Sequence, residues 1–121
     1  MFNAFLNYKA ITKGPSDNFY FGLSSEGFHR NYYRAWGDPN SEHTIICVHG
    51  VTRLSRDFDI IAKALSKNYR VICPDIVGRG YSDWFGNKSN YNILQYCADM
   101  NALIAHLNVS KVHWIGTSMG G

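Results

Sequence analysis

The chain begins with aromatic-rich segments and continues with short apolar runs that alternate with helical patterns. Residues 18–23 and 28–36 are rich in Phe and Tyr and are separated by a Ser-Ser-Glu-Gly turn, which predicts a β-hairpin. Residues 44–48 and 69–73 contain apolar runs of the kind found in strands that are covered on both faces. Residues 111–115 predict a further strand.

Two segments between these strands repeat apolar residues at helical spacing. The first has Ser55 as its expected N-cap, Asn68 as its stop, and an apolar stripe of Phe58, Ile61, Ala62 and Leu65. The second begins at Asn92, with Gln95 three residues on as in a capping box, and has an inner stripe of Ile93, Cys97, Met100, Ile104 and Leu107. This order of elements predicts an α/β fold: a mainly parallel sheet with right-handed crossovers, preceded by an antiparallel hairpin.

Length and composition restrict the class of protein. The 121 residues, 45% apolar and 17% charged, are typical of one globular domain at most, with residues 1–16 as a poorly defined leader. The net charge is +3 and the basic residues are scattered, so neither nucleic acid nor a membrane surface is predicted as a partner. Apolar runs are too short for a spanning helix or a signal-peptide core, so we expect a cytoplasmic protein.

The cysteines do not follow the spacing of disulfide frameworks or metal sites. Cys47, Cys73 and Cys97 each lie within an apolar segment, which predicts buried, reduced thiols. Cys47 and His49 come nearest to the spacing of metal ligands, and no third ligand lies nearby in the sequence. We therefore predict no metal site.

The strongest motif follows the last predicted strand, and ligands of parallel sheets bind at the carboxyl ends of strands. Gly116-Thr117-Ser118-Met119-Gly120 matches the pattern G-x-S-x-G. A nucleophilic serine must project toward a carbonyl carbon, and a sharp turn from strand to helix, with small residues two positions either side, achieves this. Ser118 is therefore a candidate nucleophile, and the alternative is a glycine-rich turn with an ordinary surface serine.

A second motif, His49-Gly50-Val51, follows the first buried strand. The backbone N–H groups of Val51 and Met119 are candidates to stabilise the charge that a carbonyl oxygen gains in acyl transfer. We expect Gly50 to let the backbone approach the substrate closely. For His49 we favour a role in ordering this loop over a role as the base, because a base must reach the hydroxyl at about 3 Å.

Residues 74–84 form a third strand-end loop that contains a G-x-G pair around Arg79. Asp83 stands where a dinucleotide-binding loop would need its third glycine, so we reject that reading. Asp75 and Asp83 are expected to be turn formers that bind the backbone of their own loop. A role of either one as the acid of a catalytic triad is the lesser alternative.

Over about residues 18–121 the sequence resembles the α/β-hydrolase superfamily. The resemblance rests on three motifs in the family's order: His49-Gly50, Pro74-Asp75 with Gly78-Arg79-Gly80-Tyr81-Ser82, and Gly116-Thr117-Ser118-Met119-Gly120-Gly121. It implies an eight-stranded, mainly parallel sheet, Ser118 as nucleophile, the amides of Val51 and Met119 as oxyanion hole, and no cofactor. A serine at the turn is similar to esterases, lipases, thioesterases and carbon–carbon hydrolases, whereas relatives acting on epoxides or haloalkanes carry an aspartate there.

The chain departs from the family after Ser118. The family's triad runs in the order serine, acid, histidine, yet all 5 histidines precede Ser118. We therefore expect the amino-terminal part of a single hydrolase domain, ending after the nucleophile turn. The alternatives are a non-catalytic remnant, a subunit that requires a complementing chain, or self-association through an exposed sheet edge.

The expected substrate is a small or medium acyl ester. Arg53 and Trp84 follow the first and second strand-end loops and are candidates to line its entrance. We favour two plainer roles, in which Arg53 pairs with Asp57 and Trp84 covers the sheet.

We predict that the 121-residue chain alone has negligible esterase activity. Loss of the triad base leaves only the weak catalysis of an oxyanion hole and substrate binding, about 10³-fold over water. Hydrolysis of a p-nitrophenyl ester by the chain and by its Ser118→Ala variant measures this. Turnover like that of an ordinary esterase, lost in the variant, would contradict the prediction.

Overall fold

The computed structural model describes residues 14–121 and shows a five-stranded mixed sheet. The strands are β1 (Ser16–Ser24), β2 (Gly27–Trp36), β3 (Thr44–Val48), β4 (Arg70–Pro74) and β5 (His113–Gly116), in the sheet order β1-β2-β4-β3-β5. β1, β2 and β4 pair antiparallel, whereas β3 pairs parallel with both β4 and β5. The predicted fold class, with its hairpin and its parallel strands, is confirmed. Of the predicted leader, residues 1–13 lie outside the described residues, and Ser16 already belongs to β1.

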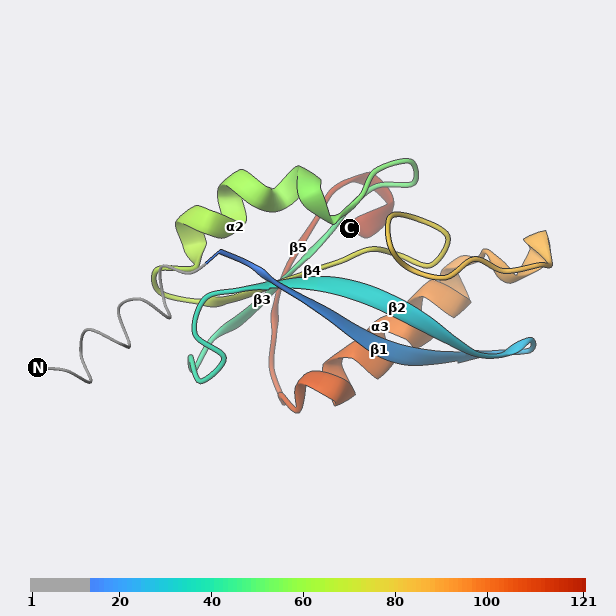
Figure 1. Cartoon of the computed structure of the whole chain (residues 1–121), viewed down its shortest axis with the longest axis horizontal. Coiled ribbons are helices and arrows are strands. Elements are labelled where there is room, and N and C mark those ends of the chain that lie inside the picture. The colour runs from blue at the N-terminus through green and yellow to red at the C-terminus, as the bar shows by residue number, and fades with distance from the viewer. Residues whose placement is uncertain (1–13) are drawn as a thin grey trace, which may run out of the picture.

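Helices cover both faces of the sheet (Figure 1). α2 (Asp59–Leu65), which follows the 3-10 turn η1 (Ser55–Phe58), lies on one face, and α3 (Ile93–Leu107) lies on the other. Two further 3-10 turns are η2 (Lys88–Asn90) and η3 (Ser118–Gly120). Within residues 14–121, no helix has both the length and the apolar content needed to cross a membrane.

The core is divided between the two faces because successive strand residues point to opposite sides. The cluster on the α3 side contains Ile46, Val48, Ile72, Met100 and Leu103, and the cluster on the α2 side contains Ile45, Cys47, Phe58, Ala62, Val71 and Cys73. Every residue of β3 is buried, which explains its unbroken apolar run. Cys47 and Cys73 are buried and form no disulfide, as predicted. Cys97 is exposed, so the prediction that its thiol is buried is wrong.

α3 buries part of the predicted stripe. Met100 and Leu107 are buried and Ile104 packs against the core, as predicted, whereas Ile93 is 57% exposed and Cys97 is exposed. Leu103 and Asp99 are the buried residues that the prediction missed. The Asp99 carboxylate contacts His29 of the hairpin.

The helix starts were predicted with partial success. The Asn92 side chain caps α3 by accepting a hydrogen bond from the Gln95 N–H at 2.9 Å, as expected. The Gln95 side chain does not complete a capping box, because it donates instead to the Leu23 carbonyl and to Asp99. Ser55 is not the N-cap of the first helical segment: Leu54 holds that position, and the Ser55 N–H binds a carboxylate of the β4 loop.

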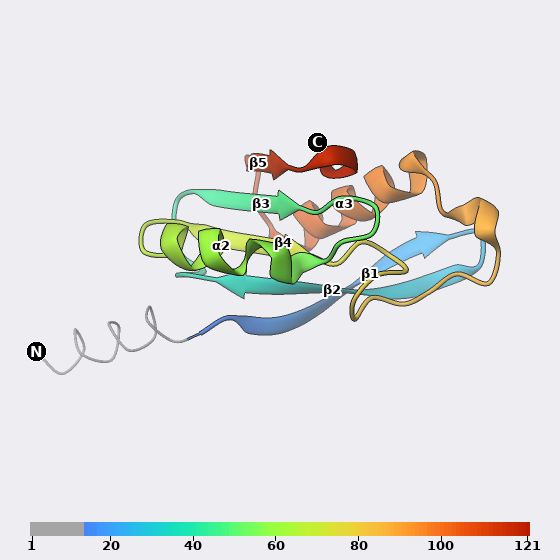
Figure 2. The same ribbon diagram turned by 90° about the horizontal axis from the view of Figure 1, so that it is seen from above.

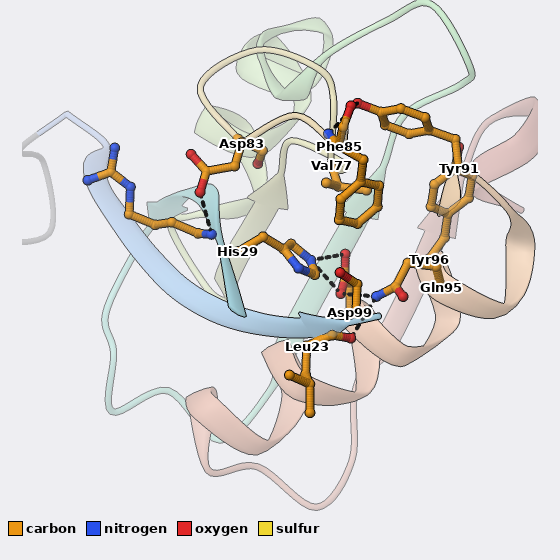
Figure 3. A network of polar contacts seen from close by, with 12 residues as sticks. Leu23, His29, Val77, Asp83, Phe85, Tyr91, Gln95, Tyr96 and Asp99 are labelled. Atoms are coloured by element: carbon orange, nitrogen blue, oxygen red, sulfur yellow. Dashed lines mark hydrogen bonds and ion pairs between the residues drawn. The ribbon is translucent and has the colours of Figure 1, made fainter. Parts of the chain in front are cut away.

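A buried polar network ties the hairpin to α3 (Figure 3). His29 Nε2 lies 2.9 Å from both carboxylate oxygens of Asp99, and Gln95 Nε2 donates to one of these oxygens at 2.9 Å. Gly22 of β1 leaves the space for this pair, because a Cβ there would lie 2.4 Å from Asp99 Oδ1 and 2.5 Å from His29 Nε2. The network thus fixes the hairpin against α3.

We predict that Gly22→Ala destabilises the protein by about 1–3 kcal/mol, the usual cost of forcing extra atoms into a packed interior. Gly14→Ala is the matched control, because a Cβ at Gly14 would meet nothing within 4 Å. Urea unfolding of the wild type and the two variants gives the free energies of unfolding. Equal stabilities of the two variants would show that the network does not require the space at Gly22.

Candidate active site

The loops after β3 and β5 lie side by side at the edge of the sheet where both strands end (Figure 2). Val48 pairs with Gly116 in the parallel register, so the segments that follow them start level with each other. The Thr117 N–H donates to the Val48 carbonyl at 3.1 Å and joins the two loops. A Cβ on Gly50 would lie 3.5 Å from the Ser118 Cβ, which places the β3 loop directly beside the serine.

Ser118 sits at a strained turn. Its φ of 51° is in the left-handed region, which costs a residue with a side chain about 1–2 kcal/mol. The turn is held by hydrogen bonds from the Gly120 N–H to the Thr117 carbonyl at 2.9 Å and from the Gly121 N–H to the Ser118 carbonyl at 3.0 Å. Ser118 is exposed at the end of β5.

Both glycines that flank Ser118 are required by close backbone contacts. A Cβ at Gly116 would lie 2.3 Å from the Gly120 carbonyl oxygen, and a Cβ at Gly120 would lie 2.1 Å from the Val48 carbonyl oxygen. Gly50 differs, because a Cβ there would make only ordinary contacts. The approach of the β3 loop to Ser118 therefore does not itself require glycine at position 50.

His49 is buried and orders the β3 loop. Its Nε2 accepts a hydrogen bond from the Ile76 N–H at 3.0 Å, so Nδ1 carries the proton and donates to the Gly50 carbonyl at 2.7 Å. Burial lowers the pKa of the imidazole, which favours the neutral ring. Both nitrogens are occupied, so this ring has no free nitrogen for the Ser118 proton.

The hydrogen bonds of Gly50 also orient the next amide. The Gly50 carbonyl accepts from His49 and from the Arg53 N–H at 3.2 Å. Because N–H and C=O point in opposite directions across a trans peptide, the Val51 N–H is directed away from His49. Among the described residues, the N–H groups of Val51 and Met119 find no acceptor. The loops after β3 and β5 therefore each contain one amide without an acceptor among the described residues.

The carboxylates of the β4 loop have structural roles. Asp75 accepts from the Tyr81 N–H at 3.0 Å, as expected of a turn former, and also from the Ser55 N–H at 2.7 Å, so its two oxygens are engaged. For Asp83 the prediction is wrong: its carboxylate accepts from the Arg30 N–H of β2 at 2.7 Å rather than from its own loop. It therefore attaches the loop to the hairpin.

The two residues considered for the entrance differ in outcome. Arg53 forms the expected pair with Asp57, with Nε–O and Nη2–O distances of 2.6 and 2.9 Å, and this pair holds the pKa of Asp57 below its usual value. Trp84 is 76% exposed, so the expectation that it covers the sheet is wrong. Sequence reasoning gave no role to Arg79, whose Nε donates to the Val51 carbonyl at 2.8 Å. The sequence feature that could have indicated a role for Arg79 was its position between Gly78 and Gly80 in a strand-end loop.

An apolar cavity of about 320 Å³ lies next to the turn, between α3 and β5. Val48, Ile76, Met100, Trp114 and Met119 contribute to its wall, and Ser118 does not. Among the residues that the structure describes, no group of His, Cys, Asp or Glu side chains is arranged to hold a metal ion.

A sequence model of the alpha/beta hydrolase fold family matches residues 43–121. The chain belongs to the α/β-hydrolase family. It is 49% identical over 111 residues to the 3-hydroxybutyrate-oligomer hydrolase of Cupriavidus necator, a match that covers 92% of this chain and 38% of that protein. The family predicted from the sequence is thereby confirmed.

Solved α/β-hydrolase structures show the same arrangement. The crystal structure of an alpha/beta hydrolase from Novosphingobium aromaticivorans matches 88% of this chain and 36% of its own length, with a TM-score of 0.77 and 36% identity. The thioesterase domain from the curacin biosynthetic pathway matches 89% of this chain and 38% of its own, with a TM-score of 0.78 and 26% identity. The chain thus spans well under half the length of these relatives.

We predict that His49 keeps the neutral Nδ1–H form down to a pH below the ordinary histidine pKa of about 6.5. Its lowered pKa means that the stability it contributes is present above the unfolded pKa and is lost as the pH falls through the folded one. The ¹⁵N shifts of the ring nitrogens report the tautomer directly. A His49 ring that takes up its second proton at or above pH 6.5 would contradict this prediction.

Proposed function

We propose that the protein is a serine hydrolase that cleaves a carboxylic ester through an acyl-enzyme on Ser118. The observation that carries the proposal is the serine at φ 51°, exposed on a turn that requires glycine on both sides and adjacent to the β3 loop. Strain of this kind persists only where the surroundings hold it, and it is concentrated at functional sites. A surface serine in an ordinary turn does not require a strained backbone conformation.

In the proposed reaction, Ser118 Oγ attacks the carbonyl carbon of the ester and loses its proton to a base. The carbonyl oxygen gains negative charge and accepts hydrogen bonds from the N–H groups of Val51 and Met119. Donors of this kind are each worth roughly 3–4 kcal/mol in the transition state. Collapse of the intermediate expels the alcohol, which takes up the proton from the base. Water then attacks the acyl-enzyme by the same steps and releases the acid.

The acid and base of the triad are proposed to come from sequence that this chain does not span. His49 and Asp75 are engaged elsewhere, and His106 Nε2 lies 3.2 Å from the Tyr33 hydroxyl. The family's order of serine, acid and histidine is consistent with this, as is the 38% coverage of the C. necator relative. On this proposal the 121 residues alone lack the base and have negligible activity.

The proposed substrate class is an ester of a small hydroxy acid, including short oligomers. The C. necator relative is named a hydrolase of 3-hydroxybutyrate oligomers. Such oligomers are joined by esters between the hydroxyl of one unit and the carboxyl of the next, so their cleavage needs the acyl transfer proposed for Ser118. They fall within the small acyl esters expected from the sequence.

A complementing chain is the second candidate arrangement. β5 is the last strand in the sheet order of residues 14–121, and within these residues it pairs only with β3. Its other edge is therefore available to another strand, either from a partner or from a second copy of the chain. In that arrangement the partner supplies the acid and the base.

We predict that a fluorophosphonate probe labels Ser118 in the full-length protein that contains this chain. Ser118→Ala should abolish labelling and lower kcat for a 3-hydroxybutyrate dimer by at least about 10⁴-fold, as in other serine hydrolases. Peptide mapping of the labelled protein locates the modified residue, and release of 3-hydroxybutyrate measures turnover.

Ser110→Ala is the control, because Ser110 is an exposed serine that precedes β5 at its other end. It should label and turn over like the wild type. Labelling at another residue, or activity retained in Ser118→Ala, would remove the nucleophile. Labelling that appears only when a second polypeptide co-purifies would favour the complementing chain.

A further inference from the structure

We infer that Arg79 is a positioning residue for the oxyanion hole and that it acts through the carbonyl of Val51. This inference rests on the proposed function, because it concerns the amide that would bind the oxyanion. Arg79 lies in the β4 loop, between Gly78 and Gly80, and its Nε donates to the Val51 carbonyl at 2.8 Å. It therefore connects the second strand-end loop to the first.

Side-chain packing does not hold Val51 in place. Its side chain is 52% exposed, and Thr52 and Arg53, which follow it, are exposed as well. Gly50, which precedes it, has no side chain. The conformation of this segment must therefore come from hydrogen bonds to its backbone.

These hydrogen bonds fix the peptide groups on both sides of Val51. The Gly50 carbonyl, in the peptide group before it, binds His49 Nδ1 and the Arg53 N–H. The Val51 carbonyl, in the peptide group after it, binds Arg79. With both planes held, rotation about the Val51 backbone bonds is restricted and its N–H keeps one direction.

Arg79 is itself held, which makes it a rigid support. Its Nη1 donates to the Val77 carbonyl at 2.9 Å and to the Tyr96 hydroxyl at 3.1 Å, and its guanidinium carbon lies 5.2 Å from the centre of the Tyr96 ring. Tyr96 belongs to α3, so the support reaches from the helix through Arg79 to the oxyanion loop. The planar guanidinium reaches these three acceptors from fixed directions, which a lysine ammonium cannot reproduce.

We predict that Arg79→Met in the full-length protein lowers kcat by about 10- to 100-fold while KM stays within about twofold, a smaller loss than removal of an oxyanion donor itself. The affinity for a boronic acid, which mimics the tetrahedral intermediate, should weaken in parallel with kcat. Guanidinium ion in the buffer should partly restore the kcat of Arg79→Ala. Hydrolysis of a p-nitrophenyl ester gives the rate constants.

Arg56→Met is the matched control. Arg56 donates to the Tyr81 hydroxyl at 2.6 Å, and its guanidinium carbon also lies 5.2 Å from the tyrosine ring, but among residues 14–121 its side chain forms no hydrogen bond with Val51. The variant removes the same type of contact without touching Val51. Its kcat, KM and boronic acid affinity should match the wild type.

The ¹⁵N relaxation order parameter of the Val51 amide tests the inference without reference to catalysis. The order parameter should be lower in Arg79→Met than in the wild type or Arg56→Met, and Arg79→Lys, which keeps the charge, should also lower it. If Arg79→Met proves unfolded, Arg79→Lys carries the same measurements. An active wild type with Arg79 variants indistinguishable from Arg56→Met would overturn the inference and leave Ser118 in place. If the fluorophosphonate does not label the wild type, both the proposed function and the inference about Arg79 are overturned.

Discussion

The close approach of the Ser118 turn to the end of β3 is the constraint on which the site depends. Only a hydrogen atom fits at Gly120, since a Cβ would lie 2.1 Å from the Val48 carbonyl oxygen. This contact holds the turn after β5 against the loop after β3, so the strained serine and the Val51 amide lie at the same edge. The parallel register of Val48 with Gly116 brings the two segments to this contact.

The sequence predicted those parts of the fold that local patterns encode. The apolar run in β3 predicted a strand buried on both faces because such a strand has no polar face to interrupt it. The stripe of α3 was predicted only in part, because the rule that apolar positions face the core does not allow for Asp99. Its burial depends on His29, which is 70 residues away, and a pairing over that distance leaves no periodic signal.

In the candidate site, too, some features follow from local sequence and others depend on residues far away in the sequence. Ser118 and its two glycines lie within one short turn, so residue types and spacing alone identified them. The direction of the Val51 amide depends on hydrogen bonds from His49, which is near in sequence, and from Arg79, which is 28 residues away. Sequence reasoning found the first bond's donor and missed the second, as it missed the contact between Asp83 and Arg30.

The three strand-end motifs therefore form one physical unit. The β3 loop has little packing of its own beyond buried His49, whose Nε2 accepts a hydrogen bond from the Ile76 N–H of the β4 loop. Arg79 of the β4 loop donates to the Val51 carbonyl. In both bonds the β4 loop donates and the β3 loop accepts. A change in the β4 loop consequently alters the amide beside Ser118 without touching either Ser118 or a substrate. On the proposal that Ser118 is the nucleophile, the β4 loop thus helps to determine how well the two amides meet the transition-state charge.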